Sequence, residues 1–179
     1  SYRISIEEFL FLDGSVRMSQ SLVRPARVLV AMKGNHRVHQ ARGSLGGAEI
    51  FDPKTNLGLD HLLTKLDHLE KAERLKPGRY KLLLSPTLTG VFAHEAFGHS
   101  QEADTWMRNR SKAKELYEKQ IRVGNDLATI ANNPAIFQNG EESTGAWGSY
   151  FFDEEGWLAE KQILVEKGYL KPPMTDMTS

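Results

Sequence analysis

The spacing of apolar residues along the 179-residue chain predicts β-strands near both ends and helices in the middle. Residues 2–12 and 22–32 are rich in β-branched and aromatic side chains, and the turn signal Asp13-Gly14 lies between them. These two runs predict a pair of antiparallel strands. Pro25 has no backbone N–H to donate, so we expect it at a sheet edge or at a break in the pairing.

Glycines shape the stretch that follows. Lys33-Gly34-Asn35 predicts a hairpin turn, and after it Gly43, Gly46 and Gly47 are expected to interrupt any regular strand. A backbone without side chains allows close approach of another group. We therefore expect Gly46 and Gly47 to line a substrate groove, together with Trp147 from the glycine-flanked stretch GAWGSYFF.

A helix is predicted over residues 57–75, ended by Pro77-Gly78. Its apolar residues recur at helical spacing and form a stripe that needs a core to cover it. The stripe consists of Leu59, Leu62, Leu63, Leu66, Leu69 and Ala72.

The next elements carry the chemistry of the chain. Residues 80–86 (YKLLLSP) predict a short apolar strand ended by Pro86, and Thr87 or Thr89 is expected to cap a helix that begins soon after. That helix carries the stretch FAHEAFGHSQEAD, residues 92–104.

The C-terminal part mixes charged, loop-like and β-like stretches. Residues 111–123 are charged and either helical or irregular, and residues 132–148 have the composition of a loop. Residues 149–170 contain two β-like runs, with residues 153–156 as the turn between them.

These patterns predict an α+β fold, with antiparallel strands around a central helical region and the motif on a helix that follows a short strand. Along the chain we expect three parts. They are a β-rich segment over 1–56, a helical region over 57–125 and a segment with a loop and a β-hairpin over 126–179.

Composition narrows the classes of function. Lys plus Arg and Asp plus Glu both number 23, so no net field favours direct nucleic-acid binding or an anionic membrane. No run approaches the roughly 20 apolar residues of a membrane span, and no signal-peptide pattern opens the chain, so we expect a cytoplasmic location. There is no cysteine, so any metal must bind through imidazole, carboxylate or water.

The motif presents His94, Glu95 and His99, with the two histidines five residues apart. On an α-helix, five residues turn about 500°, which leaves the two side chains roughly 140° apart around the axis. A straight helix therefore cannot direct both imidazoles at one ion. Either a π-bulge or a break at Gly98 would bring them together.

With either distortion, His94 and His99 would hold zinc and Glu95 would serve as general base for water. Glu102 and Asp104 are candidates to hold an imidazole N–H or the helix end. The alternative is a helix in which one histidine lies on the surface, the other lies in the core, and the two carboxylates are solvated.

The stretch SPTLTGVFAHEAFGHSQEAD resembles the signature region of the TldD/PmbA family, also known as modulators of DNA gyrase. The matching positions are Ser85, Pro86, Gly90, His94, Glu95, Ala96, Gly98, His99, Glu102 and Asp104. Arg42-Gly43-Ser44 with Gly46-Gly47, and the stretch FFDEEGWLAEKQILVEKGYL, are similar to flanking segments of the family in the same order.

The resemblance implies that His94 and His99 are ligands of Zn²⁺ and that Glu95 is the catalytic glutamate of a peptidase acting on small or unfolded peptides. It implies a homodimer or a heterodimer with a paralogous subunit. The family's third ligand is a cysteine far toward the C-terminus, so we expect this chain to be an internal fragment with an incomplete site. Two alternatives stay open: a non-catalytic interaction module of the gyrase-modulator type, and a domain that keeps the motif for structural reasons alone.

Overall fold

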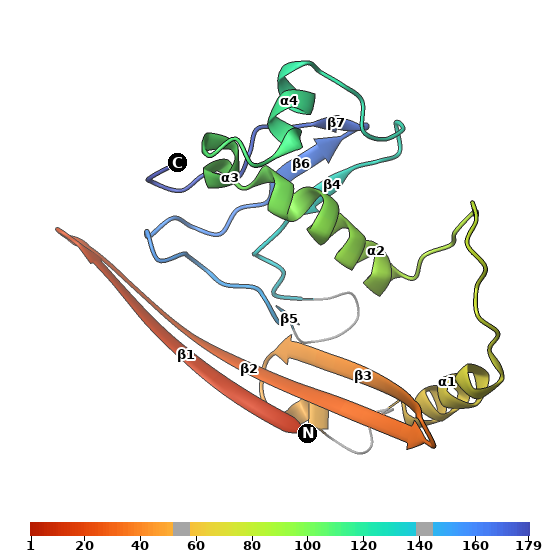
Figure 1. The fold of residues 1–179 in the computed structure, drawn as a ribbon. Helices are drawn as coiled ribbons and strands as arrows, with labels where there is room; N and C mark the ends of the chain where they lie inside the picture. The colour runs from red at the N-terminus through yellow and green to blue at the C-terminus, as the bar shows by residue number, and fades with distance from the viewer. Residues whose placement is uncertain (52–57, 139–144) are drawn as a thin grey trace. The chain divides into compact units, whose positions relative to one another are not determined.

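The computed structural model describes residues 1–51, 58–138 and 145–179, which form two compact units (Figure 1). Unit 1 comprises residues 1–79 and 136–156, and unit 2 comprises residues 80–135 and 157–179. Each unit is therefore built from two separate stretches of chain. The three consecutive parts expected from the sequence divide the chain along its length, whereas these units are defined by contacts in space.

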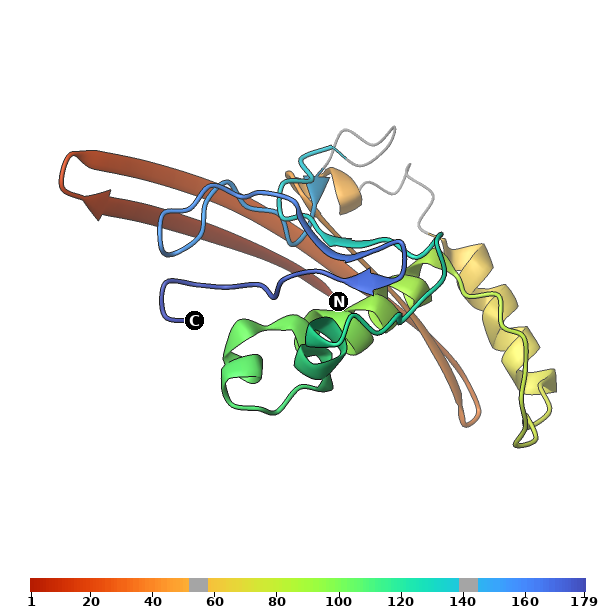
Figure 2. The ribbon, with the colours of Figure 1, turned by 90° about the horizontal axis from the view of Figure 1, so that it is seen from above.

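The sheet of unit 1 is antiparallel, with the strand order β1-β2-β3-β5. Its strands are β1 (Tyr2–Asp13), β2 (Val16–Lys33), β3 (His36–Leu45) and β5 (Gly145–Ala146). β1 and β2 form a long hairpin that is seen in both ribbon views (Figure 1, Figure 2). The two predicted strands are confirmed, and β2 starts earlier than expected because its pairing with β1 continues to Val16 beside Asp13.

Both tight turns of this sheet are made by glycines with positive φ. Gly14 has φ 54° and Gly34 has φ 56°, a region that other residues enter only at a cost. The predicted turns at these positions are therefore confirmed. Pro25 lies opposite Ile4 of β1, and the pairing of β2 with β3 covers only Ala26 and the residues after it, so Pro25 lies at a break in pairing as expected.

The expectation that Gly43 interrupts the strand is wrong. Gly43 lies inside β3 opposite Ala26, and the strand ends only at Leu45. The next residue, Gly46, has φ 139°. The glycine at position 43 serves close packing instead, because a Cβ there would lie 2.6 Å from Cδ1 of Trp147.

The predicted leucine-rich helix is α1 (Leu59–Lys71), which follows a short 3₁₀ turn η1 (Ala48–Phe51) and contacts β2 and β3. Leu57, the first residue of the prediction, lies outside the described residues. Only Leu62 and Leu66 of the apolar stripe are buried. The helix ends before Pro77-Gly78, since the backbone at Ala72 is already extended.

Residues 80–86 do not form the short strand expected directly before the motif helix, so that part of the prediction is wrong. Residues 72–85 form neither helix nor strand. Residues 72–79 belong to unit 1, and residues 80–85 belong to unit 2. Leu82 and Leu83 are exposed. An apolar run becomes a strand only where a neighbouring strand pairs with it, and no strand in the described part of unit 2 pairs with residues 80–86.

The motif helix begins with α2 (Pro86–Ala93), and its cap is not the expected one. Ser85 has an extended backbone and its Oγ accepts a hydrogen bond from the N–H of Leu88 at 3.3 Å. Pro86 occupies the first helical turn, where its missing N–H costs nothing. The prediction that Thr87 or Thr89 caps the helix is wrong, because both lie inside it.

Unit 2 combines a short antiparallel sheet with the motif helix and two further helices. The sheet has the order β4-β6-β7, and its strands are β4 (Ile130–Asn132), β6 (Gln162–Glu166) and β7 (Tyr169–Leu170). The helical elements after α2 are the π-helical turn η2 (His94–Gly98), the 3₁₀ turn η3 (His99–Gln101), α3 (Ala103–Met107) and α4 (Lys112–Glu118). Part of the ambiguous stretch 111–123 is thus helical.

One hydrophobic core lies between α3, α4 and the sheet of unit 2. Its buried residues are Trp106, Ala113, Val165 and Leu170, and partly buried Phe97, Leu116, Tyr117, Val123 and Ile130 pack around them. Phe97 belongs to the motif, so the core reaches the candidate site. None of the helices in the described ranges is long and apolar enough to cross a bilayer.

The C-terminal hairpin lies later in the chain than predicted. Residues 153–156 do form a turn, with the N–H of Gly156 donating to the carbonyl of Asp153 at 3.1 Å, but no strands flank it. The hairpin is β6–β7, and Lys167 and Gly168 form its turn with φ 48° and 81°. Two successive positive φ values are typical of a type I′ hairpin turn. Of the predicted loop over 132–148, residues 139–144 lie outside the described residues.

Two glycines at hairpin turns should differ in their tolerance of alanine. Gly14→Ala meets open space, so it should cost only the roughly 1–2 kcal/mol of a positive φ. Gly168→Ala should cost roughly 1–3 kcal/mol more, because a Cβ there collides with the carbonyl of Gly124. Urea unfolding followed by far-UV circular dichroism measures both, and equal losses would contradict the close packing of the β6–β7 turn.

Candidate metal centre

The helix that carries the motif widens at His94. Figure 1 shows α2 continuing as one rod into the motif, and there the N–H of His99 bonds to the carbonyl of His94, five residues back. This i→i+5 bond defines a π turn, which adds one residue to a helical turn. Of the two distortions that the sequence leaves open, the structure has the π-bulge.

The helix does not break at Gly98. Its φ of −59° and ψ of −68° are helical, and the chain becomes extended only at Glu102. A Cβ at Gly98 would lie 3.5 Å from Nδ1 of His94, in ordinary contact. The glycine therefore leaves open space beside the first imidazole.

The π turn brings the two histidines together on one side of the helix. Their ring centroids lie 4.4 Å apart with an interplanar angle of 68°. One ligand atom from each of His94, Glu95 and His99 lies within 4.8 Å of the other two, and all three residues are exposed. Both imidazoles and one carboxylate thus face a common point that solvent can reach.

These donors suit zinc. Zinc takes imidazole nitrogen and carboxylate oxygen, with Zn–N bonds of roughly 2.0–2.1 Å, so two nitrogen ligands of one ion lie at most about 4.2 Å apart. The ligand atoms of His94 and His99 lie within 4.8 Å of each other, which is near this limit. Because both side chains are exposed, small rotations can shorten the distance. The residues present therefore fit a zinc ion, with a further ligand position open.

Glu102 forms a hydrogen bond with the imidazole of His99. Its Oε1 lies 2.9 Å from Nδ1 of His99. Because a carboxylate only accepts hydrogen bonds, Nδ1 carries the proton and Nε2 remains for a metal. This hydrogen bond is the main cause that raises the pKa of His99 above its ordinary value; the charges of Glu102 and Glu95 add to it and desolvation opposes it.

Asp104, the other carboxylate that the sequence suggested for support, makes different contacts. Its Oδ2 lies 3.4 Å from Nη1 of Arg108, and its Oδ1 accepts from the hydroxyl of Thr105 at 3.4 Å. Asp104 lies in the first turn of α3, where a negative charge is favourable. A role for Asp104 beside the imidazoles stays a prediction.

The expected groove residues belong to unit 1, whereas the motif belongs to unit 2. Trp147 lies over Gly43, and the guanidinium of Arg24 is 5.7 Å from its ring centroid. Together with residues of β2 and β3, Trp147 borders a shallow hollow of about 300 Å³. Gly46 and Gly47 do not line it, and the N–H of Gly47 donates to Glu49 at 2.7 Å. Their part in substrate binding stays a prediction.

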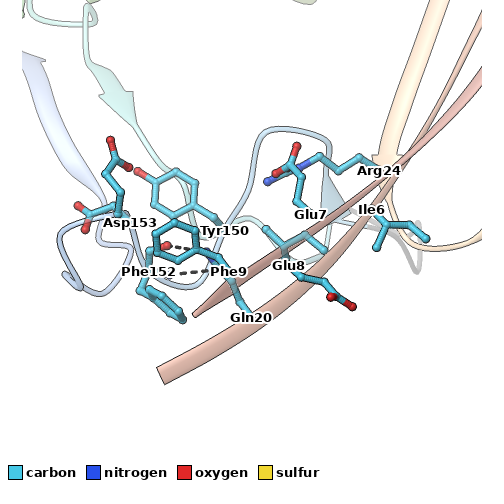
Figure 3. A pocket seen from close by; sticks show the side chains of 11 residues that line it. Ile6, Glu7, Glu8, Phe9, Gln20, Arg24, Tyr150, Phe152 and Asp153 are labelled. Carbon is cyan, nitrogen blue, oxygen red and sulfur yellow. Dashed lines mark hydrogen bonds and ion pairs between the residues drawn. The ribbon is translucent and has the colours of Figure 1, made fainter. Parts of the chain in front are cut away.

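Unit 1 has a larger hollow of about 530 Å³ on the β1–β2 hairpin (Figure 3). Figure 3 shows the Gln20 side chain directed at the backbone of Phe152, to whose carbonyl it donates at 2.8 Å. Arg24 is paired with Glu7 at 2.9 Å. Tyr150 also lines the hollow, and burial raises the pKa of its hydroxyl, with Asp153 and Glu154 contributing. The hollow contains none of the site residues expected from the sequence, although Tyr150 and Phe152 belong to the stretch GAWGSYFF.

Sequence reasoning missed the side chains that hold the end of the motif helix. The sequence pattern assigns Gln101, Trp106 and Ser111 no role at the site. Trp106 and Ser111 donate hydrogen bonds to the carbonyl of Ser100 within the motif stretch, and Gln101 donates to the carbonyl of Leu164. Only the proximity of Trp106 to the motif could have indicated it.

Comparison with known proteins identifies the family. The family model for the PmbA/TldA metallopeptidase C-terminal domain matches residues 77–179, more than half of the chain. The chain belongs to the TldD/PmbA family. The matched range contains the whole motif, including the histidine pair, Glu95 and Glu102.

Several archaeal proteins are similar to this TldD/PmbA chain. A metalloprotease of Methanocaldococcus jannaschii is 37% identical over 129 residues, which cover 72% of this chain and 26% of that protein. A metalloprotease of Methanothermobacter thermautotrophicus is 33% identical over 171 residues, 93% of this chain and 35% of that protein. A zinc metalloprotease TldD homolog of Saccharolobus solfataricus is 30% identical over 129 residues, 72% of this chain and 26% of that protein.

The chain thus spans about a quarter to a third of the length of these relatives. No solved structure matches it. The TldD/PmbA resemblance seen in the sequence is therefore confirmed at the level of the family. Activity, substrate and partners belong to the proposals below.

The hydrogen bond between Glu102 and His99 predicts a specific titration. In metal-free protein, the pKa of His99 should lie above that of an ordinary histidine, and Glu102→Gln should lower it because the anionic acceptor is lost. The ion pair of protonated His99 with Glu102 stabilises the folded state at pH values below the pKa that a histidine has in the unfolded chain. This contribution is lost as the pH rises through the higher pKa of His99 in the folded chain. NMR titration of the histidine ring protons measures the pKa, and an unchanged value in Glu102→Gln would contradict the contact.

Proposed function

We propose that this chain carries the zinc site of a metallopeptidase that hydrolyses small or unfolded peptides, with Glu95 as the general base. The observation that carries the proposal is the π turn, which gathers ligand atoms of His94, Glu95 and His99 within 4.8 Å. A second support is the relatives, several of which are named metalloproteases and one a zinc metalloprotease.

The roles of the two imidazoles follow from their surroundings. His94 and His99 would hold the ion as neutral ligands, with Nε2 of His99 directed outward by the hydrogen bond from its Nδ1 to Glu102. Protons compete for the same imidazoles, so acid should release the metal. Because Glu102 raises the pKa of His99, this competition begins at a higher pH than for an ordinary histidine.

Zinc, when bound, supplies a Lewis acid that makes water a nucleophile near neutral pH and polarises the scissile carbonyl. Glu95 follows His94 directly and reaches the same exposed point, so its carboxylate can take a proton from the attacking water. The same carboxyl group can then protonate the leaving amine. Both transfers need only one side chain that stays within hydrogen-bond reach of the reacting atoms.

Glu95 has a second potential role that the geometry also allows. Its carboxylate oxygen lies at a distance where it could be the third ligand itself. The resemblance to the family instead implies a cysteine as third ligand, and this chain has none. Neutralising Glu95 distinguishes the two roles, because a base can be lost without losing metal whereas a ligand cannot.

The partners expected from the resemblance stay predictions. These are a homodimer or a heterodimer with a paralogous subunit, and a cytoplasmic location. The interaction-module alternative also remains, and it predicts a partner complex that is indifferent both to zinc and to the charge of Glu95.

Zinc content and peptide hydrolysis in matched variants test the proposal. The wild-type chain should bind close to one zinc per chain, and His99→Ala should bind none. Glu95→Gln should keep the zinc and lose hydrolysis of a fluorogenic unfolded peptide by roughly 10²–10⁴-fold, the usual contribution of a general base. His61→Ala, on α1 of unit 1, is the matched histidine control and should change neither.

Three results would count against parts of the proposal. Hydrolysis that survives in Glu95→Gln with zinc bound would refute the role of Glu95 as base. Loss of zinc in Glu95→Gln would make Glu95 a ligand. Absence of zinc from the wild-type chain would refute the metal site and favour the interaction module.

A further inference from the structure

The carbonyl of Ser100, the residue directly after His99, accepts two short hydrogen bonds from distant side chains. Nε1 of Trp106 donates to it at 2.7 Å, and the hydroxyl of Ser111 donates to it at 2.6 Å. Trp106 lies in α3 and Ser111 is the residue that caps α4. Two elements that follow the motif therefore meet at one backbone atom beside a candidate metal ligand.

This carbonyl belongs to the end of the motif helix. The last carbonyls of any helix have no partner within the helix and must find one elsewhere. After the π turn there is only one 3₁₀ turn, η3, before the backbone becomes extended at Glu102. His99 is the first residue of that turn, so fraying of the helix end would loosen His99 directly.

The residue after Ser100 is anchored as well. Gln101 is fully buried, and its Nε2 donates to the carbonyl of Leu164 in β6 at 2.8 Å. The carbonyl of Gln101 accepts from the N–H of Met174 at 2.8 Å, and the carbonyl of Met174 accepts from Ala103 at 2.9 Å. The helix end is thus held by the sheet and by the C-terminal segment of the described chain.

The backbone of His99 is consequently fixed on both sides. On one side its N–H bonds to the carbonyl of His94, which defines the π turn. On the other side the carbonyl of Ser100 is held by Trp106 and Ser111. If the end of the helix relaxed to regular α-helical bonds, His99 would move to a position roughly 140° around the axis from His94.

We propose that Trp106 and Ser111 are positioning residues for the metal, which hold the π turn open through the Ser100 carbonyl and so keep His99 opposite His94. This inference rests on the proposed zinc site and adds to it the side chains that set its geometry. Neither residue contacts the metal; both act through the backbone. Trp106 can hold the Ser100 carbonyl in place because its ring is buried in the core with Val165 and Leu170.

Two pairs of variants test the role of the hydrogen bonds apart from packing. Trp106→Phe removes the N–H donor and keeps an aromatic ring in the core, and Trp157→Phe is its control at an exposed tryptophan of the same unit. Ser111→Ala removes the hydroxyl, which also accepts from the N–H of Ala113 at 3.0 Å as the cap of α4. Ser111→Thr restores a hydroxyl and is the rescue variant.

The readouts are the zinc dissociation constant, from competition with a chromophoric chelator, and the visible spectrum of the cobalt-substituted chain. Trp106→Phe and Ser111→Ala should each weaken zinc binding by about 10-fold or more, as is usual for side chains that orient metal ligands. Trp106→Phe and Ser111→Ala should also alter the visible spectrum of the cobalt-substituted chain. Ser111→Thr and Trp157→Phe should match the wild type both in zinc affinity and in this spectrum. Thermal unfolding of the metal-free chains shows which variants remain folded at the assay temperature.

A purely structural role would lower the unfolding midpoint and leave zinc affinity and the cobalt spectrum of the folded protein unchanged; that result overturns the inference and leaves the proposed function intact. If Trp106→Phe does not fold, the comparison of Ser111→Ala with Ser111→Thr decides in the same way. A wild-type chain that binds no zinc overturns the proposed function and this inference together.

Discussion

The hydrogen bond from the N–H of His99 to the carbonyl of His94 spans one residue more than an α-helical bond, and that extra residue brings two imidazoles to one point. Without it, the motif would present its histidines to different sides of the helix. π turns are rare because they give up regular hydrogen bonding and close packing along the helix. Such a turn persists where the surrounding structure holds it, and unit 2 provides several contacts that do so.

These contacts connect the chemistry of the motif to the packing of the unit. Phe97, within the π turn, packs against the core that also buries Trp106, and Trp106 donates to the carbonyl directly after His99. Gln101 then joins the end of the helix to β6. Phe97 and Gln101 thus attach one face of the motif helix to the core and the sheet, while His94, Glu95 and His99 stay exposed.

Local chemistry made part of the structure predictable from the sequence. The β1–β2 hairpin and the turns at Gly14 and Gly34 follow from runs rich in β-branched and aromatic residues and from glycines that adopt positive φ. The five-residue spacing of the histidines required a distortion, although the sequence could not choose between a π turn and a break. We infer that the choice depends on the contacts of Ser100 with Ser111 and of Gln101 with Leu164, which no local pattern reveals.

Two wrong predictions about strands share a physical reason. Residues 80–86 have the composition of a strand, but strand formation depends on a partner rather than on the segment itself. The turn at Asp153 looked like a hairpin turn because its residues favour turns, yet the paired strands lie on either side of Lys167 and Gly168. The cap at Ser85 is a separate case: the apolar run before it indicates a strand that ends at Pro86, whereas Pro86 already begins the helix.

The central claim is that a π turn directs both histidines at a single zinc ion, and X-ray absorption fine structure at the zinc edge tests it most directly. Spectra of the zinc-loaded wild-type chain report how many imidazoles scatter from the ion, and His99→Ala at the same zinc concentration shows whether the signal needs that residue. The account predicts two imidazole ligands in the wild type and loss of this two-imidazole signal in the variant. A wild-type spectrum with one imidazole or none, or a spectrum unchanged in His99→Ala, would contradict it.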